Sequence, residues 1–492
     1  MATLEKIIDS SKISEHAHGH AQNRFAVIPL HARLAALENF TGRGVTMAFL
    51  DSGFYPHPDL IEPRNRVAAF KDMAGEGASF EPDQSPQSWQ WHGTQTSVVA
   101  AGNGRLSDGL YRGLAPDARL VLVKASERGR ITEETIARGI EWVVENRERY
   151  DIRVLNISLG GDEDIPCSQS IVDLAAEGAV RAGIVVVAAA GNSGDAERHT
   201  PVPPANSPSV ITVGGYDDRN QLSDGPFDLY HSNFGATADQ IVKPELIAPA
   251  IWVAAPILPG TTLYSAAEAL SRLASAPDYE LPRLARDLDL PEEFSLPRGG
   301  ADEIRAALES LLRRHKIVAT HYQHVDGTSF AAPVVSSLVA QMIEANPELS
   351  PDAVKNILVS TADRLGGAPA VRQGYGAINA RRAVEMARRE RHGFTHENFS
   401  PPRVCLGKLI FAYHDDAATA VALAGDFNDW ESSRTPFSRD AMGIWRLEME
   451  PPPRGRYRYK LVVDGGRWVD DPSNGLKEPD EFGGFNSLVN IG

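Results

Sequence analysis

The chain has 492 residues, of which 42% are hydrophobic and 23% are charged, a composition typical of globular proteins with two or three domains. Its formal net charge is −16 at pH 7, so nucleic acid and anionic membranes would repel it. No segment approaches the roughly 18 consecutive apolar residues of a membrane span. We therefore expect neither a nucleic-acid partner nor a membrane partner.

The first 40 residues are predicted to form an N-terminal extension. They contain no apolar run of signal-peptide length, and they carry acidic residues where a basic region would be expected. The two cysteines, Cys167 and Cys405, are far apart in the sequence, which argues against a disulfide framework. A cytoplasmic location is the expectation that follows.

Between residues 44 and 215, short apolar runs alternate with helical patterns. Five runs have the continuous apolar character of buried strands: 44–53, 118–125, 152–161, 183–194 and 210–216. Segments 132–148 and 170–183 carry apolar residues at helical spacing. This alternation predicts an α/β fold, with a mostly parallel sheet, helices on both faces and functional groups at the carboxyl ends of the strands.

The segment 264–320 has a different character. Residues 301–316 have apolar side chains on one helical face, acidic residues at the start and basic residues at the end, as the helix dipole favours. We predict a small helical insertion here. Helical patterns resume over 329–346 and 350–362, and the first domain is predicted to span 41–392.

After a predicted linker over 393–404, the pattern changes to short alternating strands. These strands are predicted over 408–415, 420–428, 443–450, 455–465 and 487–492. Turn residues separate them at regular spacing, which predicts an all-β sandwich over 405–492.

Four polar residues lie at places where such a fold collects functional groups. Asp51 directly follows a predicted strand, His92 precedes a short apolar helix, Asn192 follows another strand, and Ser329 stands at a helix start. Each has an ordinary structural explanation, because Asp and Asn form turns and Ser caps helices. Their joint occurrence in one chain is the informative observation.

The motifs around these residues are Asp51-Ser-Gly, His92-Gly-Thr, Ala-Ala-Gly-Asn192 and Gly-Thr-Ser329-Phe-Ala-Ala-Pro. They resemble those of the subtilisin-like serine proteases, or subtilases, and Asp, His and Ser follow one another in the order associated with subtilisin. The resemblance implies a subtilisin-like, doubly wound fold and a serine endopeptidase that acts on polypeptides. It further implies that Asp51, His92 and Ser329 are the catalytic triad and that Asn192 contributes to an oxyanion hole.

The chemistry explains why these residue types are needed. A serine hydroxyl is a poor nucleophile until an imidazole accepts its proton, and a carboxylate keeps that imidazole in the right tautomer. An asparagine N–H and the backbone N–H of the serine can stabilise the negative charge of the tetrahedral intermediate. No cofactor is required for this chemistry; structural calcium occurs in the family, but no ligand loop is recognised and the metal ligands remain unknown.

Two short stretches resemble the substrate-binding segments of subtilases. Ser158, Leu159 and Gly160 are expected to pair with an extended substrate by strand addition. The run Ala189, Ala190 and Gly191 is expected to form part of the primary specificity pocket, and its small residues predict space for a sizeable apolar or neutral side chain. The alternative for both stretches is tight packing between strands and helices.

The sequence departs from the subtilase pattern in three respects. Gln95 and Val334 stand where the family commonly has histidines, although neither position belongs to the triad. The insertion at 264–320 is the third departure, because subtilases usually have a much shorter connection there. It is expected to be either a lid that filters substrates or a surface decoration.

The C-terminal stretches "GDFNDW", "YRYKLVVDG" and "WVDDPSN" resemble the glycogen-binding carbohydrate module of AMP-activated kinase β subunits and branching enzymes. The resemblance implies an immunoglobulin-like sandwich that binds an α-glucan such as glycogen. Trp430 and Trp468 would then stack on glucose rings, and Lys460 and Asn486 would bind sugar hydroxyls. The alternatives are that the tryptophans only pack the sandwich, or that the module docks other proteins.

Two other functions are alternatives to a serine endopeptidase. The first is a catalytically idle subtilase fold that serves as a scaffold for glucan or protein partners. The second is a glucan-processing enzyme, which is disfavoured because the chain shows no barrel-like catalytic domain with a carboxylate pair.

Overall fold

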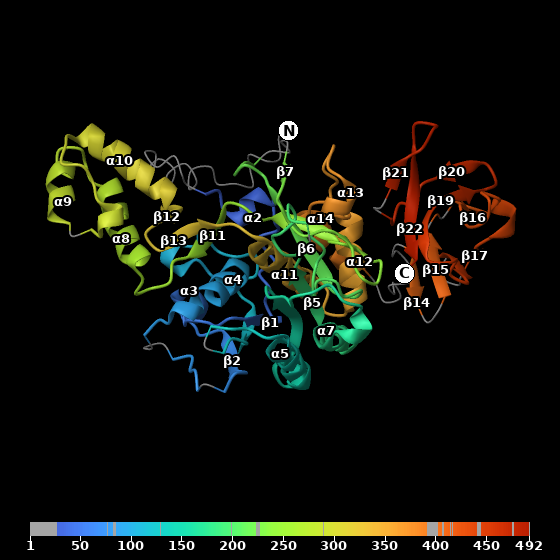
Figure 1. Cartoon of the computed structure of the whole chain (residues 1–492), viewed down its shortest axis with the longest axis horizontal. Coiled ribbons are helices and arrows are strands. Elements are labelled where there is room, and N and C mark those ends of the chain that lie inside the picture. The colour runs from blue at the N-terminus through green and yellow to red at the C-terminus, as the bar shows by residue number, and fades with distance from the viewer. Residues whose placement is uncertain are drawn as a thin grey trace.

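The computed structural model describes residues 27–390 and 402–491, except 76, 82–84, 128, 198, 223–226, 289, 406–407, 414, 416, 440–443 and 475–476. Three regions are visible: a central α/β body, a helical insertion and a C-terminal β sandwich (Figure 1). The insertion and the sandwich lie at opposite ends of the view.

The body is built on one large sheet. Its order is β10-β6-β5-β4-β1-β3-β2, all neighbours pair in parallel, and β7 adds to β6 in antiparallel orientation. The strands are β1 (Thr46–Asp51), β2 (Val67–Asp72), β3 (Arg119–Lys124), β4 (Ile152–Ile157), β5 (Val185–Ala189), β6 (Ile211–Asp217), β7 (Asp228–Leu229) and β10 (Leu246–Pro249). The predicted parallel α/β fold is confirmed.

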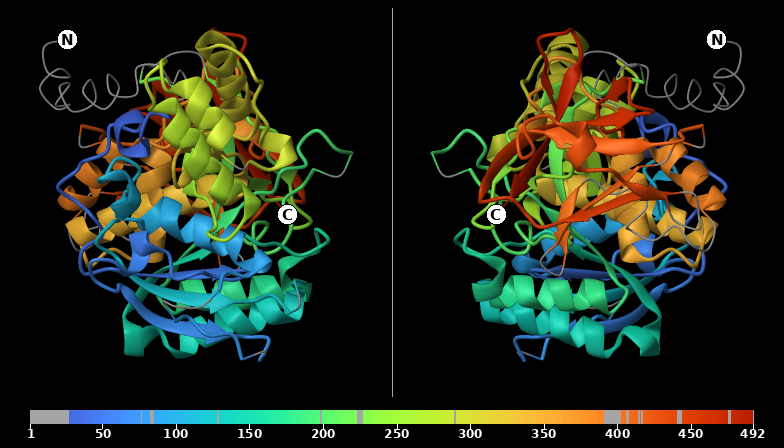
Figure 2. Two further views of the ribbon diagram at one scale, coloured as in Figure 1. Left: turned by 90° about the vertical axis from the view of Figure 1, so that its left-hand side faces the viewer. Right: turned by 90° about the vertical axis from the view of Figure 1, so that its right-hand side faces the viewer.

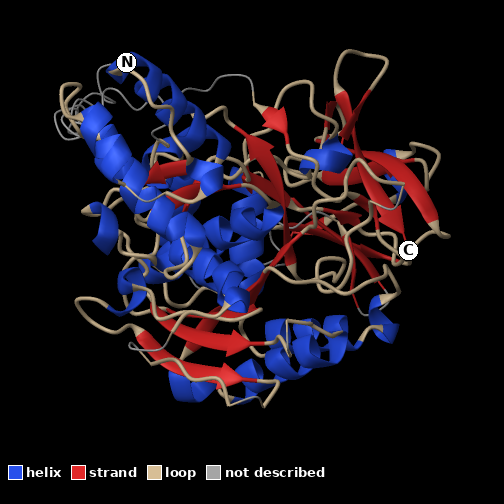
Figure 3. Cartoon of the chain, turned by 60° about the vertical axis from the view of Figure 1, so that its left-hand side comes forward, coloured by secondary structure: helices blue, strands red, loops and turns tan. Residues whose placement is uncertain are grey.

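Helices cover both faces of this sheet, as Figures 2 and 3 show. One face packs against α5 (Glu133–Glu145) and α7 (Ile171–Arg181). The other packs against α4 (Trp91–Ala101), α11 (Thr328–Ala345), α12 (Pro351–Thr361) and α14 (Ala380–Arg389). Helix α11 is buried almost throughout and is mostly apolar, whereas the outer helices bury one stripe.

Short elements complete the body. They are α2 (Leu30–Arg33), α3 (Pro58–Ile61), α6 (Arg147–Tyr150), α13 (Ala370–Gln373), β8 (Gly235–Ala236) and β9 (Val242–Lys243). Helix α2 ties residues 27–40 to the body, because the buried Arg33 forms a 2.7 Å ion pair with Asp218 and donates a hydrogen bond to the Trp252 carbonyl.

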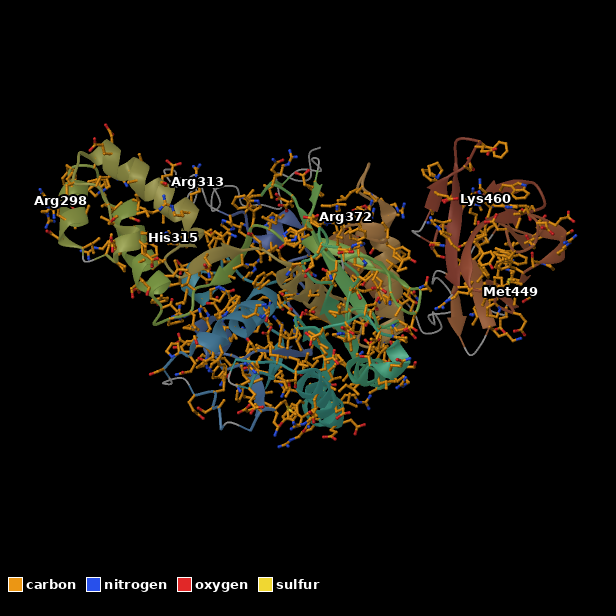
Figure 4. The ribbon with its side chains drawn as sticks, viewed as in Figure 1. Arg298, Arg313, His315, Arg372, Met449 and Lys460 are labelled. Atoms are coloured by element: carbon orange, nitrogen blue, oxygen red, sulfur yellow. The ribbon has the colours of Figure 1, made fainter. Side chains whose placement is uncertain are left out.

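The insertion is carried on a small antiparallel sheet. Strand β13 (Tyr322–Val325) pairs with β11 (Val253–Pro256) and with β12 (Ile317–Ala319). Between β11 and β12 lie α8 (Thr262–Ala274), α9 (Leu281–Asp287) and α10 (Ala301–Arg314), which enclose a core of their own. Figure 4 labels His315 just after α10, and its ring lies 4.2 Å from the buried Phe294 ring.

The C-terminal region is a sandwich of two antiparallel sheets around a shared core, as predicted. The first sheet contains β14 (Arg403–Cys405), β15 (Lys408–Tyr413), β18 (Trp445–Met449) and β17 (Ser438–Arg439). The second contains β16 (Val421–Gly425), β19 (Gly455–Val463), β22 (Phe485–Ile491) and β21 (Lys477–Pro479), with β20 (Arg467–Val469) paired to β19. Across the described parts of the chain, no helix combines the length and hydrophobicity needed to cross a bilayer.

Candidate active site

Asp51 is the last residue of β1, so it lies at the carboxyl edge of the sheet. Its side chain is 1% exposed and accepts a 2.7 Å hydrogen bond from His92 Nδ1. Thr96 Oγ1 and the Ser52 backbone N–H also donate to this carboxylate, at 3.0 and 2.6 Å. These donors compensate the cost of burying the charge and fix its orientation toward the imidazole.

Helix α4 approaches this carboxylate closely because Gly93 follows His92. A Cβ atom at Gly93 would lie 2.2 Å from the Gly53 carbonyl oxygen, so a larger residue would push the helix away from Asp51. The small residue in the His-Gly-Thr motif is therefore required by the packing of the helix against the turn after β1.

The His92 imidazole is 18% exposed and lies between two aromatic rings. Its centroid is 5.1 Å from Trp91 and 5.9 Å from Phe330, the residue after Ser329. Burial opposes protonation of this imidazole, but the charge of Asp51 and its hydrogen bond outweigh burial, so the pKa of His92 lies above the ordinary 6.5. An imidazole with this environment is suited to accept a proton near neutral pH.

Ser329 lies in the first turn of α11, but it does not cap the helix. The N-cap residue is Gly327, whose φ of 138° is a conformation that favours glycine. The Ser329 carbonyl accepts a 2.9 Å hydrogen bond from Ser158 Oγ. The hydrogen bonds between described residues include none from Ser329 Oγ to His92; such catalytic contacts commonly tighten only when substrate binds.

Asn192 is joined to the same helix start. Its Oδ1 accepts hydrogen bonds from the Thr328 N–H at 2.9 Å and from Thr328 Oγ1 at 3.0 Å. The Gly191 N–H in turn donates to Thr328 Oγ1 at 3.1 Å. Nδ2 is the donor group of this side chain, and the two hydrogen bonds to Oδ1 fix the direction in which it points. Sequence reasoning missed Thr328, although it is part of the Gly-Thr-Ser motif.

A cavity of about 800 Å³ opens beside Ser329 and Asn192. The six residues predicted to bind substrate all line it: Ser158, Leu159, Gly160, Ala189, Ala190 and Gly191. Residues 158–160 follow β4 directly and belong to no described strand, which leaves them available to an added strand. The cavity is also lined by four acidic residues that the sequence reasoning did not single out: Asp162, Glu163, Asp164 and Glu197.

The structure shows where the three departures from the family pattern lie. Gln95 is 2% exposed, and its Nε2 donates a 2.9 Å hydrogen bond to the Pro256 carbonyl at the base of the insertion. Val334 is fully buried in the body's core. The described lining of the cavity contains no residue of 262–314, so the insertion does not form a wall of this pocket.

Three of the four predicted carbohydrate-binding residues, Lys460, Trp468 and Asn486, lie on strands of one sheet, and Trp430 lies in the turn that follows β16. The Trp430 and Trp468 rings are 6.5 Å apart and inclined by 25°, and Trp430 Nε1 donates to Asp426 Oδ1 at 3.1 Å. Tyr459 and Ser487 face each other and are buried, so by alternation Lys460 and Asn486 point to the opposite face. Lys460, labelled in Figure 4, is ion-paired with Asp480.

Within the described residues, no three His, Cys, Asp or Glu side chains are grouped as metal ligands.

Fold and site together define a subtilisin-like serine protease. A sequence model described as the subtilase family matches residues 42–377, and the chain therefore belongs to the subtilase family. A second model, carbohydrate-binding module 48 (isoamylase N-terminal domain), matches residues 399–473.

Among curated proteins, the chain is similar to serine protease AprX of Bacillus subtilis strain 168, with 32% identity over 355 residues that cover 70% of this chain and 67% of AprX. It is also 32% identical to subtilisin E of the same organism over 253 residues, which cover 50% of this chain and 57% of subtilisin E. Among solved structures, fervidolysin from Fervidobacterium pennivorans aligns with a TM-score of 0.51 and 19% identity, covering 88% of this chain and 55% of that one. At this identity the last comparison shows the fold alone.

Proposed function

We propose that this subtilase is an endopeptidase in which Asp51, His92 and Ser329 form the catalytic triad. The observation that carries the proposal is the 2.7 Å hydrogen bond between the buried Asp51 and His92, formed at the sheet edge beside the helix that begins at Thr328. The proposal is further supported by the contact of the His92 ring with Phe330, the residue after Ser329, at 5.9 Å between ring centroids.

In the proposed reaction, Ser329 Oγ attacks the scissile carbonyl carbon while His92 accepts the hydroxyl proton through Nε2. Nδ1 keeps its proton in the hydrogen bond to Asp51, which stabilises the imidazolium that forms. His92 then gives the proton to the leaving amine, and an acyl-enzyme remains on Ser329. Water attacks this ester by the same route in reverse, which releases the acid and restores the serine.

The oxyanion of each tetrahedral intermediate is proposed to bind Asn192 Nδ2 and the Ser329 backbone N–H. Supporting this assignment, Asn192 is held by its Oδ1 to Thr328, so the amide is already oriented before substrate arrives. A donor fixed in advance stabilises developing charge without the cost of reorganisation.

The substrate is proposed to bind as an extended strand along residues 158–160, with one side chain in the 800 Å³ cavity. The main chain of Ser158, Leu159 and Gly160 would supply the hydrogen bonds, and the wall at Ala189, Ala190 and Gly191 leaves room for the side chain. The insertion would contact substrate on a different side from this cavity if it acts as a lid.

The C-terminal module is proposed to bind an α-glucan, with glycogen as the specific expectation. The near-parallel indoles of Trp430 and Trp468 offer flat apolar faces to sugar rings, while Lys460 and Asn486 supply polar groups on the same sheet. This arrangement would bring the peptidase to glucan-associated proteins in the cytoplasm, the expected location.

An idle scaffold is the less favoured function because all four catalytic positions hold competent residues. A fluorophosphonate probe and casein hydrolysis distinguish the two. We expect the wild-type protein to be labelled and active, and Ser329→Ala to lose labelling and about 10⁴–10⁶ in kcat. An unlabelled, inactive wild-type protein would establish the scaffold instead. Retention of Ser329→Ala on glycogen resin, with bovine serum albumin as the unbound control, tests the module separately.

A further inference from the structure

We propose that the cavity beside Ser329 selects a basic residue, arginine or lysine, on the acyl side of the scissile bond. This inference rests on the proposed peptidase function and specifies its substrate class. It also revises the expectation of an apolar or neutral side chain, which rested on the small residues at 189–191 alone.

The charge of the cavity lining is the first argument. Asp162, Glu163, Asp164 and Glu197 contribute four carboxylates to the wall. Of the described residues in that lining, only His199 can carry a positive charge. The His199 ring stacks on Phe234 at 4.5 Å, and its Nδ1 donates to the Ala196 carbonyl, so this imidazole is held against the protein.

The position of these carboxylates in the chain is the second argument. Only Gly161 separates residues 162–164 from the predicted substrate-pairing segment 158–160, so a substrate paired there would place its side chain near them. The intervening turn is fixed, because the Gly161 N–H donates to the Pro203 carbonyl at 2.7 Å and the Asp162 N–H donates to Glu133 Oε1 at 3.3 Å. A Cβ atom at Gly161 would lie 2.2 Å from that Glu133 oxygen, so the turn is tightly packed on α5.

Hydrogen bonds fix the orientation of one of these carboxylates, that of Asp164. Asp164 Oδ1 accepts hydrogen bonds from Asn206 Nδ2 and from the Ala238 N–H, both at 3.1 Å. These neutral donors fix the carboxylate without supplying a counter-charge. Asp164 is half-buried, so its charge is less screened by water than that of a fully exposed side chain.

The shape of the cavity suits a long cationic side chain. The small wall at Ala189, Ala190 and Gly191 can pack against the apolar stem of lysine or arginine, while the charged head reaches the carboxylates. An apolar side chain could pack against the same wall, but it would leave the four carboxylates without a positively charged partner. An acidic side chain would be repelled. A carboxylate in the corresponding pocket of trypsin selects basic residues by the same electrostatics.

The test uses the full-length protein and a matched series of tetrapeptide p-nitroanilides that differ only in the residue before the amide: Arg, Lys, Leu, Phe and Glu. We expect kcat/KM for Arg and Lys to exceed that for Leu and Phe at least tenfold, with Glu lowest. The Arg preference should fall as ionic strength rises, because salt screens the attraction.

A charge-neutral variant, Asp162→Asn/Glu163→Gln/Asp164→Asn/Glu197→Gln, should lower the Arg-to-Leu ratio about tenfold while hydrolysis of the Leu substrate is retained. Retained Leu hydrolysis also shows that the variant is folded. Asp195→Asn is the matched control, since this exposed acid lies in the same loop as Glu197 but outside the described lining. The single variant Glu197→Gln, at an exposed position, should lower the ratio by a smaller factor.

A wild-type preference for Leu or Phe, or an unchanged Arg-to-Leu ratio in the neutral variant, would overturn the basic specificity and leave the peptidase proposal intact. Failure to cleave any substrate, together with no labelling of Ser329 by fluorophosphonate, would instead overturn the proposed function on which this inference rests.

Discussion

The two predicted functional surfaces of this chain are built in opposite ways. In the catalytic body, Asp51 is 1% exposed and three donors fix its carboxylate. In the sandwich, Trp468 is 46% exposed, and Trp430 is oriented by a single hydrogen bond from its indole to Asp426. The charged group of the first surface is buried, whereas an aromatic ring of the second is exposed to solvent.

The difference follows from what each surface has to do. A carboxylate that stabilises an imidazolium acts more strongly where water is excluded, provided that donors compensate its burial. A ring that stacks on a sugar has to be reachable, and its binding energy comes from covering apolar area. Substitutions should therefore affect one activity strongly and leave the other unchanged.

The largest expected effect comes from Asp51→Asn. The variant keeps the shape of the side chain but favours the wrong imidazole tautomer, so kcat should fall by about 10⁴. Retention on glycogen resin should be unchanged. A decrease in kcat of less than tenfold would contradict the triad assignment. A simultaneous loss of glucan binding would show that the two surfaces do not function independently.

The pH profile of the same pair sharpens this result. His92 has to be neutral to accept the serine proton, so kcat/KM of the wild-type protein should rise with pH through the pKa of His92, which lies above 6.5. The Asp51 charge contributes to raising this pKa, so the midpoint measured for the residual activity of Asp51→Asn should move to lower pH. A midpoint that stays in place would show that another group controls the profile.

Asn192→Ala should have the next largest effect. Loss of its N–H donor to the oxyanion should lower kcat by about 10²–10³ with little change in KM. Thr328→Val is the control, because it removes the hydroxyl that contacts Asn192 Oδ1 and keeps the amide itself. If both variants lose activity equally, Asn192 acts by holding the start of α11 and not by binding the oxyanion.

Trp468→Ala tests the predicted carbohydrate-binding surface, where a substitution should affect sugar binding and not peptidase activity. Removing one of the two indoles should weaken binding of a linear maltooligosaccharide about tenfold, measured by calorimetry, and leave peptidase activity unchanged. Trp91→Ala is the matched control, since Trp91 is 47% exposed but lies beside His92 in the body. Equal losses of sugar binding in both variants would exclude the predicted stacking site.

The sequence predicted those parts of the fold that local patterns determine. Strands β1 and β5 were recognisable because they are almost continuous apolar runs, and α11 because apolar residues recur at helical spacing along it. Strand β2 was missed because it is half-buried along its length and mixes apolar with polar residues. Strand β10 is only four residues long and ends in proline.

The candidate site was predictable to the extent that its motifs are local. Asp51, His92, Asn192 and Ser329 could be found from short motifs, but no local signal shows that Asn192 Oδ1 holds Thr328. The acidic wall was missed for the same reason. Glu197 meets residues 162–164 only through the tertiary fold, where loops after β4 and β5 converge at one cavity.

The smallest expected effect concerns Asp173, a buried carboxylate that lacks the hydrogen-bond donors found around Asp51. Asp173, in the first turn of α7, is fully buried, and neither of its carboxylate oxygens has a hydrogen-bond partner among the described residues. Burial raises the pKa of Asp173 from 3.8 to about 7. The folded protein thus binds a proton here that the unfolded chain releases above pH 4, so stability falls as pH rises from about 4 to about 7 and the loss persists above pH 7.

Linkage between pKa values of 3.8 and about 7 gives at most roughly 4 kcal/mol at pH 8, and burial of the Asn amide without partners offsets part of it. Asp173→Asn should therefore gain about 1–2 kcal/mol over the wild-type protein at pH 8 and nothing at pH 4. Thermal unfolding at the two pH values measures the difference. Asp51→Asn should show no such gain at pH 8, because the Asp51 carboxylate already has three donors in the folded state. If Asp173→Asn were less stable than the wild-type protein at pH 8, the fold would stabilise the charged form of Asp173. A carboxylate could then be buried in this domain without donors like those that surround Asp51.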